Sequence, residues 1–525
     1  MPEPAAALGN VLAVNGSALV VGVDRAAGAG QRPLTLGELV ALPAGSNVAI
    51  GIVHALRHGR RAEDHAIADV QLVGEVVQAG GAPRFRRGVS VFPVLDAPVR
   101  RADPVLAAVV FAPPTATSVP VGRLSSAPDV PAHLLVDAML GKHFAVLGST
   151  GSGKSWTVAR ILNAVLEVCP AAHIVLLDPH GEYAAAFGPR AEALDLANLE
   201  LPYWLMNFEE TAAILAPQRD GRGYTEASIL KEALLAARLA WAKGNGGAGG
   251  PVTVDTPIPY RLTDLVKLID EAMGALNKAE GAAPYRHLLT RIESIRADRR
   301  YAFLFQSLYV RDNMDQVLGR LLRFPVEGRP VTVIDLSGVP SEIVDVVVSL
   351  LCRMLFEFGL WSERGRATPL LLVCEEAHRY VPASAELGFE PSRRAIDRIA
   401  KEGRKYGVSL GLVTQRPAEL SPSALSQCGT VVALRMANER DQAFVRTTLP
   451  EGSDWLLASL PALATGEAIV LGEGVTLPMR VQLDPLPPGA QPASHTPAFS
   501  QAWREDRAGL DLVRDTVRRW REQRR

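Results

Sequence analysis

The sequence has few cysteines and no long apolar run. Its four cysteines lie far apart in 525 residues and form no Cys-x-x-Cys pair, which argues against a zinc site or a disulfide framework and favours a reducing compartment. The N-terminus lacks the basic and apolar segments of a signal peptide. The most apolar runs, such as 344–351, are far shorter than the ~20 residues that span a bilayer. We therefore expect a cytoplasmic protein with no membrane segment.

The chain also lacks an excess of either charge. It has 55 basic and 56 acidic residues, which gives a formal net charge of −1. This balance neither favours nor excludes nucleic acid as a partner, because a ring-shaped protein can confine its basic residues to a central channel. The hydrophobic fraction of 48% and the charged fraction of 21% are typical of a well-packed globular protein. The length predicts two to four domains.

The first part of the chain, 1–125, shows short alternating runs of apolar and polar residues between Gly, Pro and Asn. This pattern predicts a small β-barrel or sandwich. We find no aromatic platform there for stacking bases, which favours a structural or docking role over direct contact with nucleic acid. The expected strands lie near 11–14, 18–23, 47–53, 70–77 and 89–94.

From 126 to 490 the pattern becomes α/β. Continuous apolar runs alternate with amphipathic helical stretches, as expected for buried parallel strands. Residues 205–325 are helical in pattern, and we interpret them as an insertion. The expected strands are 143–147, 173–177, 331–335, 370–374 and 408–413, with later strands at 430–434 and 467–471 and an edge strand at 475–483.

The most informative motif is Gly-Ser-Thr-Gly-Ser-Gly-Lys-Ser at 148–155, a complete G-x-x-x-x-G-K-[ST] phosphate loop. A strand precedes it and a helical pattern follows, so a helix N-terminus would face the phosphates. Lys154 can reach the β- and γ-phosphates and the Ser155 hydroxyl can ligate Mg²⁺. The motif predicts binding of ATP or GTP with Mg²⁺. The predicted nucleotide-binding residues here are Gly148, Ser149, Thr150, Gly151, Ser152, Gly153, Lys154, Ser155 and Trp156.

Two carboxylates end the apolar run 370–374. Glu375 stands in the first position and would hold Mg²⁺, commonly through water. Glu376 would polarise an attacking water molecule. The commoner pair is Asp-Glu, so Glu375 is one methylene longer than usual. A solvated strand end is the alternative.

The segment after the second strand, Leu-Leu-Asp-Pro-His-Gly-Glu-Tyr at 176–183, carries three further candidates. The carboxyl ends of parallel strands face the ligand crevice of a sheet. We therefore predict that Asp178, His180 and Glu182 lie near the γ-phosphate. An ordinary turn is the alternative.

The strand 408–413 is flanked by candidate residues on both sides. Gln415 follows it and could orient water or contact the γ-phosphate. Arg404 precedes it and is our first candidate for an arginine that completes the site of a neighbouring subunit, with Arg398 second; such an arginine raises rates on the order of 10³ or more in other NTPases. A basic helix end that complements the helix dipole is the competing interpretation.

The tail, 491–525, contains a basic amphipathic helix pattern. Its apolar residues Leu510, Val513, Val517 and Trp520 are spaced three and four apart. Packing on the parent fold or on a neighbouring subunit is favoured over membrane binding, because only one short stripe is present.

In this order, the strings GSTGSGKS, DPHGEY, LLVCEEAH, EGRKYG and TQRP resemble the HerA family of hexameric DNA translocases. The segment 87–93 resembles the family's N-terminal barrel. The resemblance implies a RecA-like P-loop core, a homohexameric ring with ATP between subunits, and double-stranded DNA in the central channel. It also implies a partner, either a nuclease of the NurA type in DNA end processing or another effector subunit in phage defence.

Three readings of the function stay open at this stage. The first is an ATP-driven DNA translocase or helicase. The second is an ATPase scaffold that assembles and activates an effector with little unwinding of its own. The third is a conjugation or secretion motor at a membrane, which the missing membrane segment disfavours in its self-anchored form.

Overall fold

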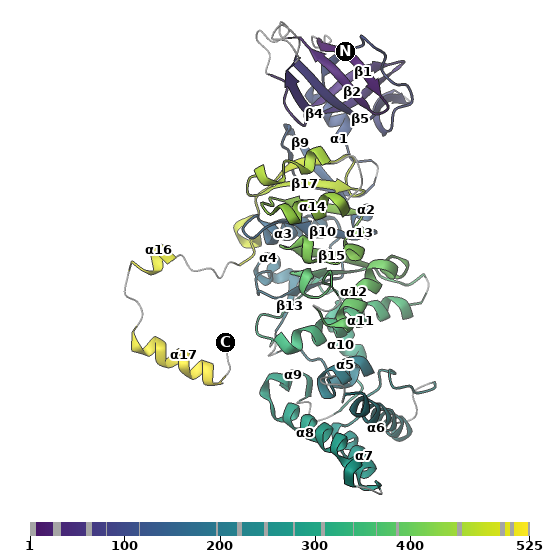
Figure 1. Ribbon diagram of the computed structural model, residues 1–525, viewed down its shortest axis with the longest axis vertical. Coiled ribbons are helices and arrows are strands. Elements are labelled where there is room, and N and C mark those ends of the chain that lie inside the picture. The colour runs from purple at the N-terminus through teal and green to yellow at the C-terminus, as the bar shows by residue number, and fades with distance from the viewer. Residues whose placement is uncertain are drawn as a thin grey trace. The chain divides into compact units, whose positions relative to one another are not determined.

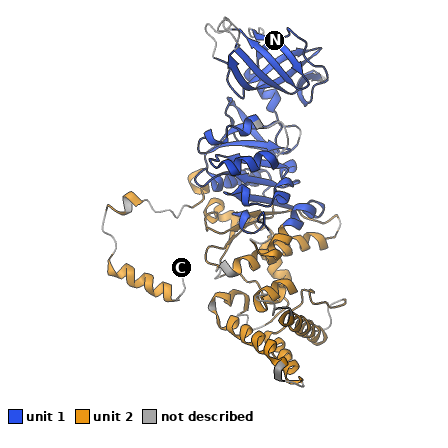
Figure 2. Cartoon of the chain, viewed as in Figure 1, with its two compact units in different colours: residues 1–170, 376–387, 397–486 blue, residues 171–375, 388–396, 487–525 orange. Residues whose placement is uncertain are grey.

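The computed structural model divides the chain into two compact units (Figure 2). Unit 1 comprises Met1–Pro170, Glu376–Leu387 and Asp397–Leu486, and unit 2 comprises Ala171–Glu375, Gly388–Ile396 and Pro487–Arg525. The structure describes residues 7–24, 33–58, 66–79, 81–114, 116–195, 198–217, 223–245, 250–276, 279–305, 310–339, 341–363, 365–384, 388–448, 454–493, 499–504 and 509–522.

Unit 1 begins with a closed antiparallel β-barrel, as expected (Figure 1). The strand order is β2-β1-β7-β3-β4-β5, and pairing of β2 with β5 closes it. Alternate side chains such as Val11, Val40 and Val70 fill the barrel interior, as period-2 strands require. The bounds are β1 Ala7–Asn15, β2 Ala18–Val23, β3 Leu39–Ala44, β4 Asn47–His58, β5 Ala66–Ala79 and β7 Pro98–Arg101, with β6, Ala82–Arg87, added at the edge of β5.

The predicted strand at 89–94 is wrong. This segment lies in the connection between β6 and β7. The backbone N–H of Ser90 donates to the side chain of Glu75 at 3.1 Å instead of to a neighbouring strand, and Pro93 has no N–H to offer. Apolar side chains alternate here, but the backbone hydrogen bonds go elsewhere, and Phe92 is exposed.

The rest of unit 1 contains half of the α/β core. Strand β10, Phe144–Leu147, lies parallel to β15, Val408–Thr414, and β16, Thr430–Leu434. The sheet continues antiparallel through β17, Glu467–Gly472, and β18, Met479–Leu483, to the hairpin of β8, Ser118–Leu124, and β9, Ala127–Leu135. That hairpin spans the boundary that we expected at residue 125.

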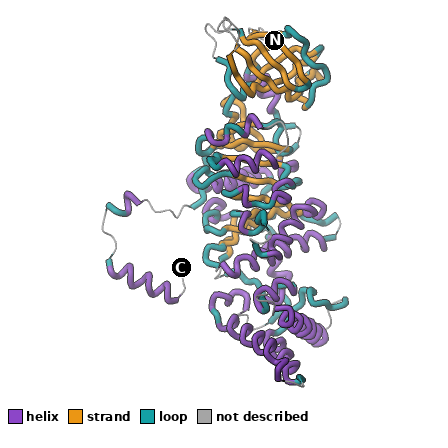
Figure 3. The backbone as a smooth tube through the Cα atoms, in the orientation of Figure 1, coloured by secondary structure: helices purple, strands orange, loops and turns teal. Residues whose placement is uncertain are grey.

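The helices of unit 1 are short apart from α3, which follows the phosphate loop (Figure 3). They are α1 Pro104–Phe111, α2 Val136–Leu140, α3 Lys154–Val168, α13 Pro422–Ser426, α14 Glu439–Thr448 and α15 Asp454–Leu457. Helix α12, Glu390–Glu402, begins in unit 2 and ends in unit 1.

Unit 2 holds four parallel strands in the order β12-β13-β11-β14. Every residue of β11 and β14 is buried, which explains why these strands appear as continuous apolar runs in the sequence. The strands are β11 Ile174–Asp178, β12 Ala191–Leu194, β13 Val331–Asp335 and β14 Leu370–Cys374. The other strands expected in the α/β core also lie within one residue of their predicted positions, with one exception. The strand expected at 475–483 begins at Met479, and it is not an edge strand, because β18 pairs with β17 on one side and with β8 on the other.

Between β12 and β13 the described chain of unit 2 is helical, from α5 Phe208–Leu215 through α6 Gly223–Gly244, α7 Leu262–Gly274, α8 Ala283–Ala297 and α9 Ala302–Phe305 to α10 Met314–Leu322. The fully buried Arg238 holds this region together, because its guanidinium donates to the carbonyls of Trp204, Met206, Val254 and Thr256.

The described part of unit 2 contains four more helices. They are α4 Ala184–Phe187, α11 Ser341–Trp361, α16 Phe499–Ala502 and α17 Leu510–Glu522. Helix α17 coincides with the predicted basic amphipathic helix, and its apolar residues Leu510, Val513 and Trp520 are exposed in the single chain. Among the described residues, no helix is long and apolar enough to cross a membrane.

Candidate functional site

The phosphate loop depends on glycine at three positions. Gly151 and Gly153 have φ angles of +74° and +99°, in the left-handed region that side chains disfavour. A Cβ at Gly148 would lie 2.6 Å from Ser152 Oγ and 2.7 Å from Leu434 Cβ. The first and last glycines of the motif therefore serve different purposes. Gly148 allows close packing, and Gly153 allows the turn into α3.

The backbone of this loop is prepared for an anion. Within the described part of the chain, the N–H groups of Thr150, Gly151 and Gly153 make no hydrogen bond. Lys154 is only 8% exposed, and its ammonium group donates to the carbonyl of Ser149 at 3.3 Å. A buried cation beside N–H groups at a helix N-terminus favours phosphate.

Two neighbouring strands hold the loop in place. The N–H and hydroxyl groups of Ser149 both donate to the carbonyl of Arg435, at 3.0 and 2.9 Å. The hydroxyl group of Thr150 donates to Oε1 of Gln415, just after β15. The structure therefore brings Gln415 to the phosphate loop, although Gln415 and Thr150 are 265 positions apart in the chain.

Glu376 has a strained backbone. Its φ angle is +52°, which is uncommon for a residue with a side chain and is often found at functional sites. Its carboxylate is 3.3 Å from Nδ1 of His378, and that nitrogen is 2.9 Å from the hydroxyl oxygen of Thr414. Burial lowers the pKa of His378, and the charge of Glu376 opposes this shift. His378 and Thr414 were not among the predicted site residues, although His378 ends the same segment as the glutamates.

In unit 2, Asp178 is fully buried and holds its own loop. Its carboxylate accepts hydrogen bonds from the backbone N–H groups of His180 at 3.2 Å, Gly181 at 2.9 Å and Tyr183 at 2.8 Å. Burial raises the pKa of Asp178, and these hydrogen bonds oppose the increase. The contacts give Asp178 a role in shaping the loop.

Glu375 has a partner that sequence reasoning missed. The phenol group of Tyr183 donates to Oε2 of Glu375 at 2.7 Å, and both side chains are buried. Of the other candidates in this loop, His180 is exposed and Glu182 is half-buried, with its carbonyl accepting from the N–H of Ala493 at 2.8 Å. Tyr183 ends the segment that was singled out, but nothing local in the sequence indicates contact with Glu375.

Both candidate arginines belong to unit 1 and are exposed. Arg398 lies on α12, and Arg404 lies in the short 3₁₀ turn Gly403–Tyr406 before β15. Within the described part of the chain, the side chain of Arg404 makes no hydrogen bond or ion pair. Arg404 is thus the more accessible of the two for a second molecule.

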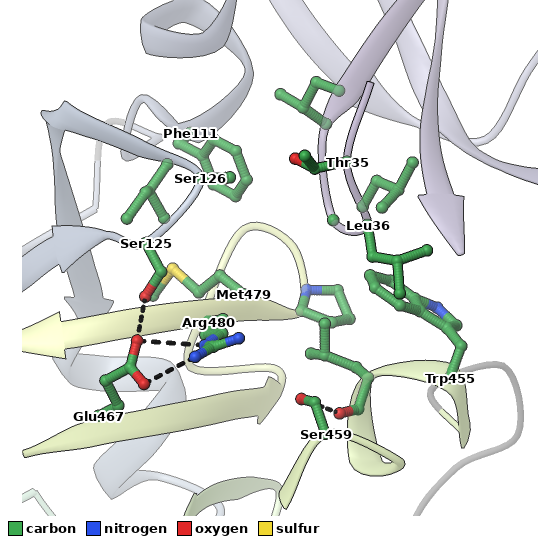
Figure 4. Close-up of a pocket in the computed structure, with 16 residues that line it drawn as sticks. Thr35, Leu36, Phe111, Ser125, Ser126, Trp455, Ser459, Glu467, Met479 and Arg480 are labelled. Carbon is green, nitrogen blue, oxygen red and sulfur yellow. Dashed lines mark hydrogen bonds and ion pairs between the residues drawn. The ribbon is translucent and has the colours of Figure 1, made fainter. Parts of the chain in front are cut away.

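Unit 1 also contains a cavity of about 530 Å³ that no residue of the phosphate loop lines. The carboxylate of Glu467, on β17, accepts from Ser125 at 3.1 Å and from Arg480 at 2.7 Å at one wall of this cavity (Figure 4). Glu467 also accepts from the N–H of Ala464 at 2.9 Å, which fixes the turn that precedes β17.

A phosphate loop between a buried strand and a helix, with a glutamate pair at the end of another buried strand, defines a P-loop ATPase. Residues 119–355 match the central domain of the helicase HerA. Over this region the chain is similar to the HerA family, and it has a RecA-like P-loop core.

Two relatives show how far the similarity extends. The DNA double-strand break repair helicase HerA of Pyrococcus furiosus is 29% identical over 402 residues, 69% of each chain. The protein of the same description from Sulfurisphaera tokodaii is 26% identical over 509 residues, 93% of this chain and 95% of the relative. Among solved structures, VirB4 of Thermoanaerobacter pseudethanolicus matches with a TM-score of 0.49 and 16% identity, over 71% of this chain and 98% of that chain.

Proposed function

We propose that this protein is an ATP-driven translocase or helicase for double-stranded DNA that works as a homohexameric ring. The observation that carries the proposal is the prepared phosphate loop, with its positive-φ glycines and buried Lys154, in a chain whose long relatives are described as DNA double-strand break repair helicases.

Each residue in the hydrolysis site has a proposed role. Lys154 contacts the β- and γ-phosphates, Glu376 polarises the attacking water, and Gln415 contacts the γ-phosphate or orients that water. Ser155 and Glu375 fit Mg²⁺, because a hydroxyl and a carboxylate are the oxygen ligands that this ion takes beside phosphate and water. When bound, Mg²⁺ would neutralise charge on the phosphates. The described residues contain no group of three or more ligands that would hold a metal ion by themselves.

The loop after β11 has a divided role in this proposal. All three candidates, Asp178, His180 and Glu182, would serve the nucleotide, but Asp178 would act by fixing the loop, because its oxygens already accept three backbone N–H groups. His180 and Glu182 would supply the direct contacts.

The test of the function is ATP hydrolysis with and without duplex DNA. We expect DNA to stimulate turnover, and we expect Lys154→Ala to abolish it while Lys243→Ala, an exposed lysine of α6, leaves it unchanged. Full turnover by Lys154→Ala would refute the proposal. Turnover that requires a partner protein and ignores DNA would instead favour the scaffold function.

We propose Arg404 as the arginine that completes a neighbour's site, with Arg398 as the second candidate. Its exposure, and a guanidinium group without a hydrogen bond or ion pair in the described chain, support this choice. In mixed rings, Arg404→Ala subunits should hydrolyse ATP where a wild-type neighbour borders their site, and Lys154→Ala subunits should supply that arginine. Mixed rings that show only the summed activity of the separate proteins would contradict a role in trans.

The proposed partners are a nuclease of the NurA type in DNA end processing or another effector subunit in phage defence. The relatives' description as break repair helicases supports the first. Co-purification of the full chain with the product of a neighbouring gene, followed by a nuclease assay on linear duplex DNA with ATP, tests it. Nuclease activity that does not require ATP, or that is the same with the Lys154→Ala variant as with the wild type, would argue against this partnership.

A further inference from the structure

Trp156 is an exposed aromatic residue directly beside the phosphate loop. It follows Ser155 in the first turn of α3 and is 43% exposed. Resting on the ATPase function proposed above, we infer that the nucleobase of the bound nucleotide stacks on the indole ring of Trp156. A tryptophan side chain provides a large rigid surface that stacks on any base.

The position of the phosphates sets the direction in which the base must leave the loop. Lys154 reaches the β- and γ-phosphates, and the loop backbone cradles the α- and β-phosphates. The Thr150–Gln415 contact lies in the middle of the loop, before Lys154. The α-phosphate, and with it the ribose and base, therefore lies toward the first turn of α3, where Trp156 stands.

The orientation of α3 shows what Trp156 faces. Arg160, one turn later, donates to the carbonyls of Pro120 at 3.0 Å and Val121 at 3.4 Å. Residues four apart share a helix face, and helical side chains lean toward the N-terminus. Trp156 thus lies on the face directed at β8, at the end nearer the phosphate loop.

A fixed turn lies beside the phosphate loop. A Cβ at Gly153 would be 3.8 Å from the backbone nitrogen of Gly466. The carbonyl of Gly466 accepts from Leu483 N–H at 2.9 Å and from the amide group of Gln482 at 3.2 Å. Since Glu467 also anchors this turn through Ala464, Ser125 and Arg480, the turn is a rigid edge against which a base can be placed.

Binding of two ligands by the full chain separates base stacking from a structural role. We would measure the affinity of a non-hydrolysable ATP analogue and of inorganic tripolyphosphate, each with Mg²⁺, by calorimetry. Trp156→Ala should weaken the ATP analogue about tenfold, within the range for base–aromatic stacking, and leave tripolyphosphate unchanged. Trp156→Phe should retain most of the affinity because it keeps an aromatic face.

The control is Trp361→Ala, which removes a tryptophan that is 82% exposed at the end of α11 and should change neither affinity. Equal weakening of both ligands by Trp156→Ala would overturn the inference and assign Trp156 to the shape of the loop. An unchanged affinity for the ATP analogue would also overturn it. In both cases wild-type binding of tripolyphosphate would leave the proposed ATPase function standing, whereas a wild type that binds neither ligand would refute both.

Discussion

Two strand–turn–helix segments of the core differ in what their backbone N–H groups bind. They are β10–α3 in unit 1 and β11–α4 (α4, Ala184–Phe187) in unit 2. After β10, glycines with positive φ turn the chain and three N–H groups make no hydrogen bond within the described residues. After β11, the carboxylate of Asp178 accepts three N–H groups of its own loop.

This difference distinguishes a loop whose backbone can bind phosphate from a loop whose backbone is held in place by its own carboxylate. N–H groups without an internal partner can satisfy themselves on phosphate oxygens, and the helix dipole adds to the attraction. N–H groups that already donate to a buried carboxylate cannot do so without breaking those bonds. A binding role for the second loop must therefore come from its other side chains.

Among the variants that compare the two loops, Gly153→Ala should have the largest effect. The φ angle of +99° strains any residue with a side chain, so the loop should lose its shape, and ATP turnover should fall on the order of 10² or more because positioning is lost. Gly328→Ala is a matched control, because Gly328 has φ +74° with no atom within 4 Å of a Cβ. Steady-state turnover at saturating DNA measures both. Equal losses in the two variants would show that strain alone, not phosphate binding, explains the result.

Asp178→Asn should act on stability more than on phosphate binding. Loss of charge and of one acceptor oxygen leaves buried N–H groups poorly satisfied, which costs about 1–3 kcal/mol. Urea unfolding should show the loss, while tripolyphosphate binding should persist. Asp195→Asn is the control, because Asp195 accepts from Asn198 N–H at 3.2 Å in an exposed loop. Abolished tripolyphosphate binding at full stability would contradict the division between the two loops.

Tyr183→Phe should have a smaller effect that is confined to Glu375. Removal of the phenol group deletes the 2.7 Å hydrogen bond, worth about 1 kcal/mol. We expect a severalfold change in the Mg²⁺ concentration that gives half-maximal ATP turnover, with little change in the affinity for tripolyphosphate alone. A Mg²⁺ dependence identical to the wild type would show that Tyr183 only fills space.

The barrel offers a carboxylate that extends the comparison with Asp178. Glu75 is fully buried and also accepts a backbone N–H, but it has Arg86 as a partner. Hydrogen bonds from Ser90 and Arg86 lower the pKa of Glu75 from 4.5 to about 2, whereas burial raises the pKa of Asp178.

Glu75→Gln should have the smallest effect on the nucleotide site and should instead change the acid response of the barrel. A lowered folded pKa contributes stability above the unfolded pKa of 4.5, and this contribution is lost as the pH falls toward about 2. The wild-type barrel should therefore lose more stability across this range than the variant does. Unfolding monitored at several pH values between 5 and 2 measures it, and parallel curves for the two proteins would rule out this role of Glu75.

Much of the core was predictable because its signals are local. Buried parallel strands show as apolar runs, so β11, β13 and β14 could be placed within one residue. The segment 89–94 was wrongly predicted as a strand because an alternating pattern reflects only the polarity of the side chains. It does not show that the backbone N–H of Ser90 donates to Glu75, 15 residues earlier. Strand β18 was predicted too long for a similar reason, since apolar residues from Val475 onward are buried without strand pairing. It was also predicted as an edge strand, because its pairing with β8, which lies more than 350 residues earlier in the chain, has no local signal.

The sequence by itself determined the phosphate loop, the glutamate pair and the class of chemistry, because these depend on neighbouring residues whose spacing and backbone freedom are encoded locally. Only the tertiary structure decided that Tyr183 bonds Glu375, that Gln415 meets Thr150 and that the turn at Gly466 lies beside Gly153. These partners are distant in the chain and meet only where sheet pairing and packing place them. The same contacts turn a motif into a site whose residues have distinct and testable roles.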